Sequence, residues 1–193
     1  MIRAFVAVPV EDPVVRRRLA GAHSLLPPLR GVRWIPESQL HFTVKFLGEI
    51  GADRVTAAKA ATAAAAARAA GGVRLALEGL GAFPPRGPAR VLWAGCGEGA
   101  EALTSIGAAV EAAFEAEGFP REERPFSPHL TLARVKDPDA GKRLTRALPT
   151  IPPEPFGAVR VSSLVLYQSD LTPRGAEYTE LLRVAIESAA APQ

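Results

Sequence analysis

Two copies of a His-x-Thr pattern are the residues of this sequence whose types and spacing best suit chemistry. The first copy carries His41 and Thr43, and the second carries His129 and Thr131. Both stand in apolar runs, HFTVKFLG and HLTLARV, which are rich in the β-branched and aromatic residues typical of strands. Alternation along a strand places each imidazole and its hydroxyl on one face, about 6.6 Å apart at roughly 3.3 Å per residue. The pattern therefore predicts two strands that line two sides of one cleft.

Two imidazoles can supply both halves of an acid–base reaction. The unperturbed pKa of histidine, near 6.5, allows one ring to be neutral while its partner is cationic. The sequence has 3 His in total, and two chance His-x-Thr pairs among them are expected in roughly one chain in a hundred. Either His alone is better explained as an ordinary half-exposed strand residue, whereas the pair favours function. The two copies are too similar for the sequence to assign acid and base.

Composition places the chain among ordinary globular proteins. It has 193 residues, of which 48% are hydrophobic and 22% charged, enough for one sizeable core or two small lobes. We find no run long enough to span a membrane and no signal peptide, so we expect a cytoplasmic protein. The net charge of +3 permits an RNA or nucleotide partner without pointing to one. A lone Cys96 excludes an internal disulfide, and we interpret it as a buried or incidental thiol.

The elements that must position the two motifs follow the same order in each half of the chain. In the first half we expect strands at 3–9, 41–48 and 73–83, with helices from Pro13 to about Leu26 and over 53–70. In the second half we expect strands at 90–95 and 129–135, and helices over 98–117 and 140–148. A long strand over 156–168, a turn at 169–178 and a final strand near 178–186 complete the chain. The Pro- and Gly-rich stretch near residues 84–89 is the predicted boundary between the halves.

These motifs and their flanks resemble the 2H phosphoesterase superfamily, named for its two His-x-Thr motifs. The resemblance rests on HFTV and HLTL, on PFSPH ahead of the second copy, and on Arg134 three residues beyond Thr131. It extends to the late segment LYQSDLTPRGAEYTEL and so covers nearly the whole chain. Within the superfamily, the chain is similar to bacterial and archaeal RNA 2′,3′-cyclic phosphodiesterases, also called 2′-5′ RNA ligases.

The resemblance implies a bilobal α+β fold, formed by a single domain over residues 1–193. Two pseudo-symmetric antiparallel sheets would face a central cleft, with helices on their outer faces. It also implies hydrolysis of the 2′,3′-cyclic phosphate at RNA 3′ ends, with tRNA fragments among the candidate substrates. His41 would be the proton donor to the leaving 3′-oxygen and His129 the proton acceptor from water, leaving a 2′-phosphate. We expect a monomer that needs no cofactor.

Several further residues are candidates to bind such a substrate. The hydroxyls of the two motif threonines, together with Arg134, would hold the nonbridging phosphate oxygens. Strand alternation puts Lys45 on the face of the first histidine and makes it a second phosphate-binding candidate, although an exposed edge lysine is an equally good explanation. Trp34, Phe126 and Tyr167 are candidates to stack on a base, but most aromatic residues at such positions belong to a core.

Three other functions deserve comparison. Two His on neighbouring strands can bind zinc, but the third imidazole, His23, lies in a predicted helix with no His-Glu partner motif, so we favour metal-free chemistry. A nucleotide- or RNA-binding module could use the same cleft without turnover; the presence of both His and both Thr favours catalysis. The same acid–base pair could also run reversible 2′-5′ ligation without ATP, and the sequence has no GxxxxGK[ST] loop.

Overall fold

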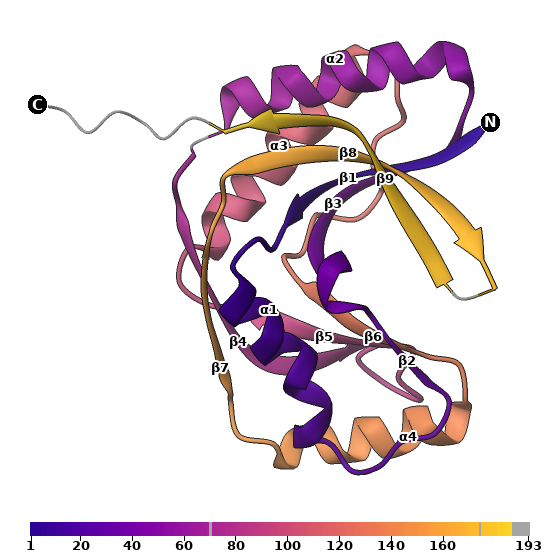
Figure 1. Ribbon diagram of the computed structural model, residues 1–193, viewed down its shortest axis with the longest axis vertical. Coiled ribbons are helices and arrows are strands. Elements are labelled where there is room, and N and C mark those ends of the chain that lie inside the picture. Colours follow the sequence, from indigo (N-terminus) through magenta and orange to yellow (C-terminus); the bar gives the residue numbers. More distant parts are fainter. Residues whose placement is uncertain (70, 174, 187–193) are drawn as a thin grey trace, which may run out of the picture.

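The computed structural model of the protein describes residues 1–69, 71–173 and 175–186 (Figure 1). The strands are β1 (Ile2–Pro9), β2 (Val32–Trp34), β3 (His41–Ile50), β4 (Arg74–Phe83), β5 (Val91–Cys96), β6 (Leu130–Val135), β7 (Pro155–Arg160), β8 (Ser163–Thr172) and β9 (Gly175–Ala185). The α-helices are α1 (Pro13–Ala20), α2 (Ala52–Arg68), α3 (Ala100–Ala116) and α4 (Pro138–Ala147). Short 3₁₀ segments cover Gly21–Leu25, Glu37–Gln39 and Leu148–Thr150.

The strands form two antiparallel sheets. One has the order β3-β1-β8-β9 and the other the order β2-β6-β5-β4-β7. In Figure 1, α2 lies above the first sheet and α3 passes behind it, while α1 and α4 lie beside the second. The predicted bilobal α+β fold, with helices on the outer faces of two antiparallel sheets, is confirmed.

The helices begin where local chemistry predicts. Asp12 caps α1, since its carboxylate accepts hydrogen bonds from the backbone N–H groups of Val14 and Val15 at 2.8 and 3.0 Å, and a proline occupies the first turn. Asp137 caps α4 in the same way through the N–H of Asp139. The α-helical part of the first predicted helix is shorter than expected, because the chain tightens into a 3₁₀ segment from Gly21.

The two lobes do not correspond to the two halves of the sequence. The stretch at 84–89, predicted to divide the halves, connects β4 to β5, which pair within one sheet. The predicted single strand over 156–168 is two strands in different sheets, because β7 pairs with β4 while β8 pairs with β1. The segment expected as a turn continues β8 to Thr172 and begins β9 at Gly175. Both sheets therefore depend on pairings between residues far apart in the sequence.

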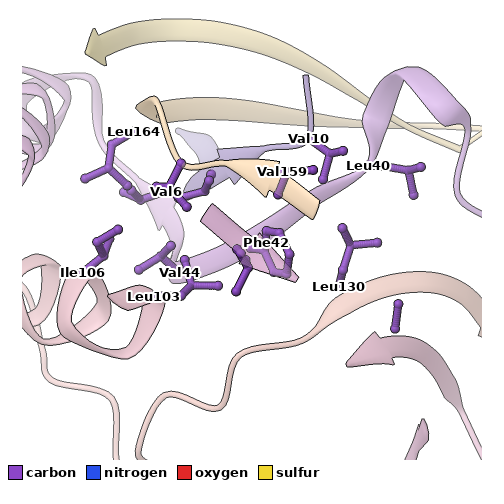
Figure 2. Close-up of a cluster of buried hydrophobic side chains, with 14 of the residues drawn as sticks. Val6, Val10, Leu40, Phe42, Val44, Leu103, Ile106, Leu130, Val159 and Leu164 are labelled. Carbon is purple, nitrogen blue, oxygen red and sulfur yellow. The ribbon is translucent and has the colours of Figure 1, made fainter. Parts of the chain in front are cut away.

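A shared core anchors the two motif strands (Figure 2). Phe42 of β3 and Leu130 of β6 are both 0% exposed, and β3 contacts β6. Burial of a large apolar side chain stabilises a fold by about 1.5–3 kcal/mol. Each motif therefore has an anchor between its His and its Thr, and strand alternation turns those two polar side chains away from the core.

Candidate active site

One cleft of about 1160 Å³ brings together the residues of both motifs. His41 and Thr43 line it from β3, Thr131 and Arg134 line it from β6, and His129 lines it from the position just before β6. The imidazoles and hydroxyls that are 88 residues apart in sequence thus face the same space. This is the arrangement that the two motifs predict.

Both imidazoles are oriented by the same backbone contact. Nδ1 of His41 lies 2.6 Å from the carbonyl oxygen of Gln39, and Nδ1 of His129 lies 2.7 Å from that of Ser127. A carbonyl oxygen only accepts, so each Nδ1 carries a proton and donates it. In a neutral ring this leaves the lone pair on Nε2, which is the nitrogen free to exchange protons with a ligand. The sequence did not predict this hydrogen bond, because the acceptor is a backbone carbonyl and a residue of any type two positions before the His can supply it.

His41 has a further hydrogen-bond partner, and its surroundings shift its pKa. Its Nε2 lies 3.0 Å from Oγ1 of Thr43, so in the neutral ring it accepts a hydrogen bond from that hydroxyl. Burial lowers the pKa of His41 to about 4; the hydrogen bond to Gln39 opposes this shift, and the positive charge of Arg134 adds to it. The ring is therefore neutral near pH 7 in the empty cleft. The effect of Arg134 also shows that the two lobes bring this guanidinium close to the first motif.

A phenylalanine ring supports each imidazole. The ring centroids of Phe5 and His41 are 5.1 Å apart, and those of Phe83 and His129 are 5.0 Å apart. Packing of this kind restricts ring rotation and excludes water from one side of each imidazole. Neither phenylalanine was predicted as a site residue, because both lie on strands that meet the motifs only through sheet pairing.

The prediction that Lys45 shares the cleft face with His41 is wrong. Along the pairing of β3 with β1, Thr43 opposes Ala7 and Lys45 opposes Val6, so Val44 is an extra residue in a β-bulge. A bulge reverses the alternation of the residues beyond it. Lys45 accordingly points inward and is 3% exposed. Its Nζ pairs with Oε1 of Glu111 at 2.7 Å and donates to the carbonyl oxygen of Pro120 at 3.0 Å.

The three aromatic candidates have different surroundings. Phe126 lines the main cleft and covers Gly107 of α3. Tyr167 instead lines a smaller cavity that His41 also borders, and burial raises the pKa of its hydroxyl to about 12. Trp34 lines neither cavity and packs against the core and the ring of His23, so its predicted role in base stacking finds no support in this site. As with Lys45, its position depends on tertiary contacts.

A metal site has no support in the side-chain arrangement. Over residues 1–69, 71–173 and 175–186, no three His, Cys, Asp or Glu side chains group closely enough to hold a metal ion. Burial raises the pKa of the Cys96 thiol to about 11, which keeps it protonated and a weak nucleophile near neutral pH. In the same described ranges, no helix is long and apolar enough to cross a membrane.

Comparison with known proteins identifies the family to which the chain belongs. The family model described as "2'-5' RNA ligase superfamily" matches residues 9–173, a span that includes both motifs. The chain belongs to the 2′-5′ RNA ligase superfamily. An RNA 2′,3′-cyclic phosphodiesterase of Archaeoglobus fulgidus is 32% identical over 182 residues, which cover 93% of this chain and 98% of that protein.

Solved structures of similar proteins share the fold. The protein TT0787 of Thermus thermophilus superposes with a TM-score of 0.79 at 32% identity, covering 97% of this chain and 99% of that one. E. coli LigT complexed with 3′-AMP gives a TM-score of 0.76 at 25% identity, covering 96% and 98% of the two chains. Membership of the 2′-5′ RNA ligase superfamily thus extends over nearly the full length of the chain.

Proposed function

We propose that this protein hydrolyses the 2′,3′-cyclic phosphate at RNA 3′ ends to a 2′-phosphomonoester. The observation that carries the proposal is the pair of imidazoles that line one cleft, each with Nδ1 donating to a backbone carbonyl, so that Nε2 is the nitrogen left for proton transfer. The name of the A. fulgidus relative supports a 2′,3′-cyclic phosphate as the reacting group, and the 3′-AMP bound by E. coli LigT supports a nucleotide as the ligand of such a cleft.

The reaction needs a base and an acid on opposite sides of phosphorus. In our proposal, Nε2 of His129 takes a proton from water as the water oxygen bonds to phosphorus. Nε2 of His41 gives a proton to the 3′-oxygen as its bond to phosphorus breaks. Each role is typically worth about 10²- to 10⁴-fold in rate. The hydroxyls of Thr43 and Thr131 and the guanidinium of Arg134 bind the nonbridging oxygens, where negative charge grows.

Because the pKa of His41 is low in the empty cleft, we propose that substrate binding promotes protonation of this imidazole. In the empty cleft this ring is neutral near pH 7, because it is buried and faces Arg134. A bound phosphodiester brings a negative charge beside Nε2 and offsets the charge of Arg134. Both effects raise the pKa of His41, so the proton donor is formed when the substrate binds.

Every step of this mechanism uses side chains that the cleft contains. We therefore propose that turnover is independent of metal ions. By microscopic reversibility, the same two imidazoles can join a 2′,3′-cyclic phosphate end to the hydroxyl of a second RNA, with no ATP. We propose this 2′-5′ ligation as the reverse of a cleavage step at the same site.

The test is ³¹P NMR of a short RNA ending in a 2′,3′-cyclic phosphate, incubated with enzyme and a strong chelator. The wild-type protein should form a 2′-phosphomonoester, and His41→Ala and His129→Ala should each lose several orders of magnitude in rate. His23→Ala is the matched control, because that imidazole packs against Trp34 outside the cleft. A cyclic phosphate that binds but survives would show a recognition module instead, and activity restored only by zinc would contradict the metal-free mechanism.

A sulfur substitution assigns the acid and the base. Replacing the leaving 3′-oxygen of the substrate by sulfur gives a thiolate, which departs without a proton because a thiol pKa is only about 8.5. His41→Ala should then lose far less activity on the sulfur analogue than on the natural substrate. His129→Ala should lose as much on both. The reverse pattern would exchange the two roles.

A further inference from the structure

An exposed phenylalanine lies in the cleft beyond the first motif. Phe46 is 52% exposed and lines the cleft together with Leu171, which is 73% exposed. The other large hydrophobic residues this exposed in the described part of the chain are Met1 and Val14, and neither lines the cleft. Exposure of large apolar side chains costs free energy in water, so a pair of them inside a functional cleft indicates a binding surface.

The bulge in β3 explains why Phe46 is there. The extra residue Val44 reverses the alternation, so that Lys45 turns inward and Phe46 turns into the cleft. The ring of Phe46 is backed by that of Phe5, with centroids 6.1 Å apart. The ring is thus supported behind and open in front, as a base-stacking platform must be.

The second sheet has the same bulge with a different residue beyond it. In β6, Thr131 opposes Trp93 and Ala133 opposes Leu92, so Leu132 is the extra residue. Three positions after the motif threonine, β6 therefore presents Arg134 to the cleft where β3 presents Phe46. A guanidinium suits a phosphate and a phenyl ring suits a base. The two sides of the otherwise pseudo-symmetric cleft therefore differ, with a phosphate-binding side chain on β6 and a base-binding side chain on β3.

A second cation lies further along the first sheet. Arg3 is exposed and lines the cleft from β1, and within the described residues it forms no ion pair. Ala7 is the β1 partner of Thr43, and the four residue steps from Ala7 to Arg3 span about 13 Å at roughly 3.3 Å per step. An arginine side chain does not bridge that distance to the reacting phosphate at Thr43. Arg3 is therefore placed for a different phosphate.

The cleft has room for more than one nucleotide. Its volume of about 1160 Å³ exceeds the roughly 300–1,000 Å³ that is usual for small-molecule sites. Glu122 and Glu123 also line it, so its mouth is not uniformly positive. What distinguishes Arg3 is its position beyond Phe46 along the first sheet, and not the net charge of the cleft.

We propose that Phe46 and Arg3 form a subsite for the nucleotide on the 5′ side of the cyclic end, with its base against Phe46 and its phosphate on Arg3. The inference rests on the proposed function and names its substrate class: oligoribonucleotides in preference to nucleoside 2′,3′-cyclic phosphates. Stacking of one base on an aromatic ring corresponds to roughly a fivefold to hundredfold gain in affinity. We expect a preference of this size in kcat/KM.

The test compares kcat/KM for a 5′-phosphorylated dinucleotide and for a nucleoside, each ending in a 2′,3′-cyclic phosphate. The wild-type enzyme should prefer the dinucleotide by about tenfold or more, and both Phe46→Leu and Arg3→Ala should lose most of that preference. Phe46→Leu keeps an apolar side chain and removes the flat ring, so it separates stacking from packing. Val14→Ala and Arg160→Ala are the matched controls, because both side chains are exposed and neither lines the cleft.

Salt provides an independent measurement. The dinucleotide carries more phosphates than a nucleoside cyclic phosphate, so its kcat/KM should fall more steeply with KCl, and Arg3→Ala should remove most of the difference. Equal kcat/KM for the two substrates in the wild type would overturn the subsite while the proposed function stands. A preference that survives both variants would also overturn it. Failure of the wild type to turn over either substrate would overturn both proposals.

Discussion

Replacing Lys45 by Met tests whether this lysine supports the fold or binds substrate. Its ammonium group is buried and contacts two elements of the chain outside its own strand. One is Glu111 of α3, and the other is the carbonyl oxygen of Pro120, in the loop that leads to His129. The second carboxylate oxygen of Glu111 accepts a hydrogen bond from the N–H of Glu122 in the same loop. The ion pair therefore connects β3, which carries the first motif, through α3 to the loop that precedes the second motif.

The size of the effect follows from burial. Breaking a buried ion pair by removing one partner costs about 3–5 kcal/mol, because the other charge stays behind unpaired. The side chain of Glu111 is 18% exposed, so water can partly solvate it, and we expect a loss near the lower end, about 3 kcal/mol. For a domain of this size that corresponds to a fall in Tm of about 6–12 °C.

A double-mutant cycle separates the two interpretations. Lys45→Met and Glu111→Leu should each lower the free energy of urea unfolding, while the double variant should regain much of the loss, since apolar replacements leave no unpaired charge. Binding of a nucleoside 2′-phosphate should change little in Lys45→Met at a temperature where it is folded. Unchanged stability together with a large rise in the Kd for the 2′-phosphate would refute the reasoning and place Lys45 in the substrate site.

Three further outcomes test the site. In an NMR titration, the His41 ring of the free protein should stay neutral down to about pH 4, and a bound 2′-phosphate should raise this midpoint; an unmoved midpoint would contradict substrate-assisted protonation. Arg134→Ala should lower kcat by about 10²- to 10³-fold, and Arg134→Lys, which keeps the positive charge, should recover part of that loss. An equal loss of kcat in both variants would instead mean that the paired N–H donors of the guanidinium are needed. Gly81→Ala should destabilise the fold by about 1–3 kcal/mol through overpacking, since its Cβ would lie 2.2 Å from the ring of Trp93. Gly21→Ala, which meets nothing within 4 Å, is its control in urea unfolding.

The motifs themselves were predictable because they depend on local geometry. Alternation between His41, Phe42 and Thr43 needs only an extended backbone and a core on one side, and Phe42 is buried as expected. The same argument holds for the second motif through Leu130. It failed at Lys45, because a β-bulge is a mismatch between two paired strands and leaves no mark in either sequence alone.

The sequence by itself determined most of the strand and helix segments, the start of the first helix at Pro13, and the four polar side chains of the motifs, since each depends on residues close along the chain. Tertiary structure alone decided which strands share a sheet, as when β8 joins β1 and leaves β7 to the other lobe. It also decided the low pKa of His41, which arises from burial and from the guanidinium of Arg134 in the other lobe. Long-range contacts set the electric field and the solvent access of a group, and those two quantities control its chemistry.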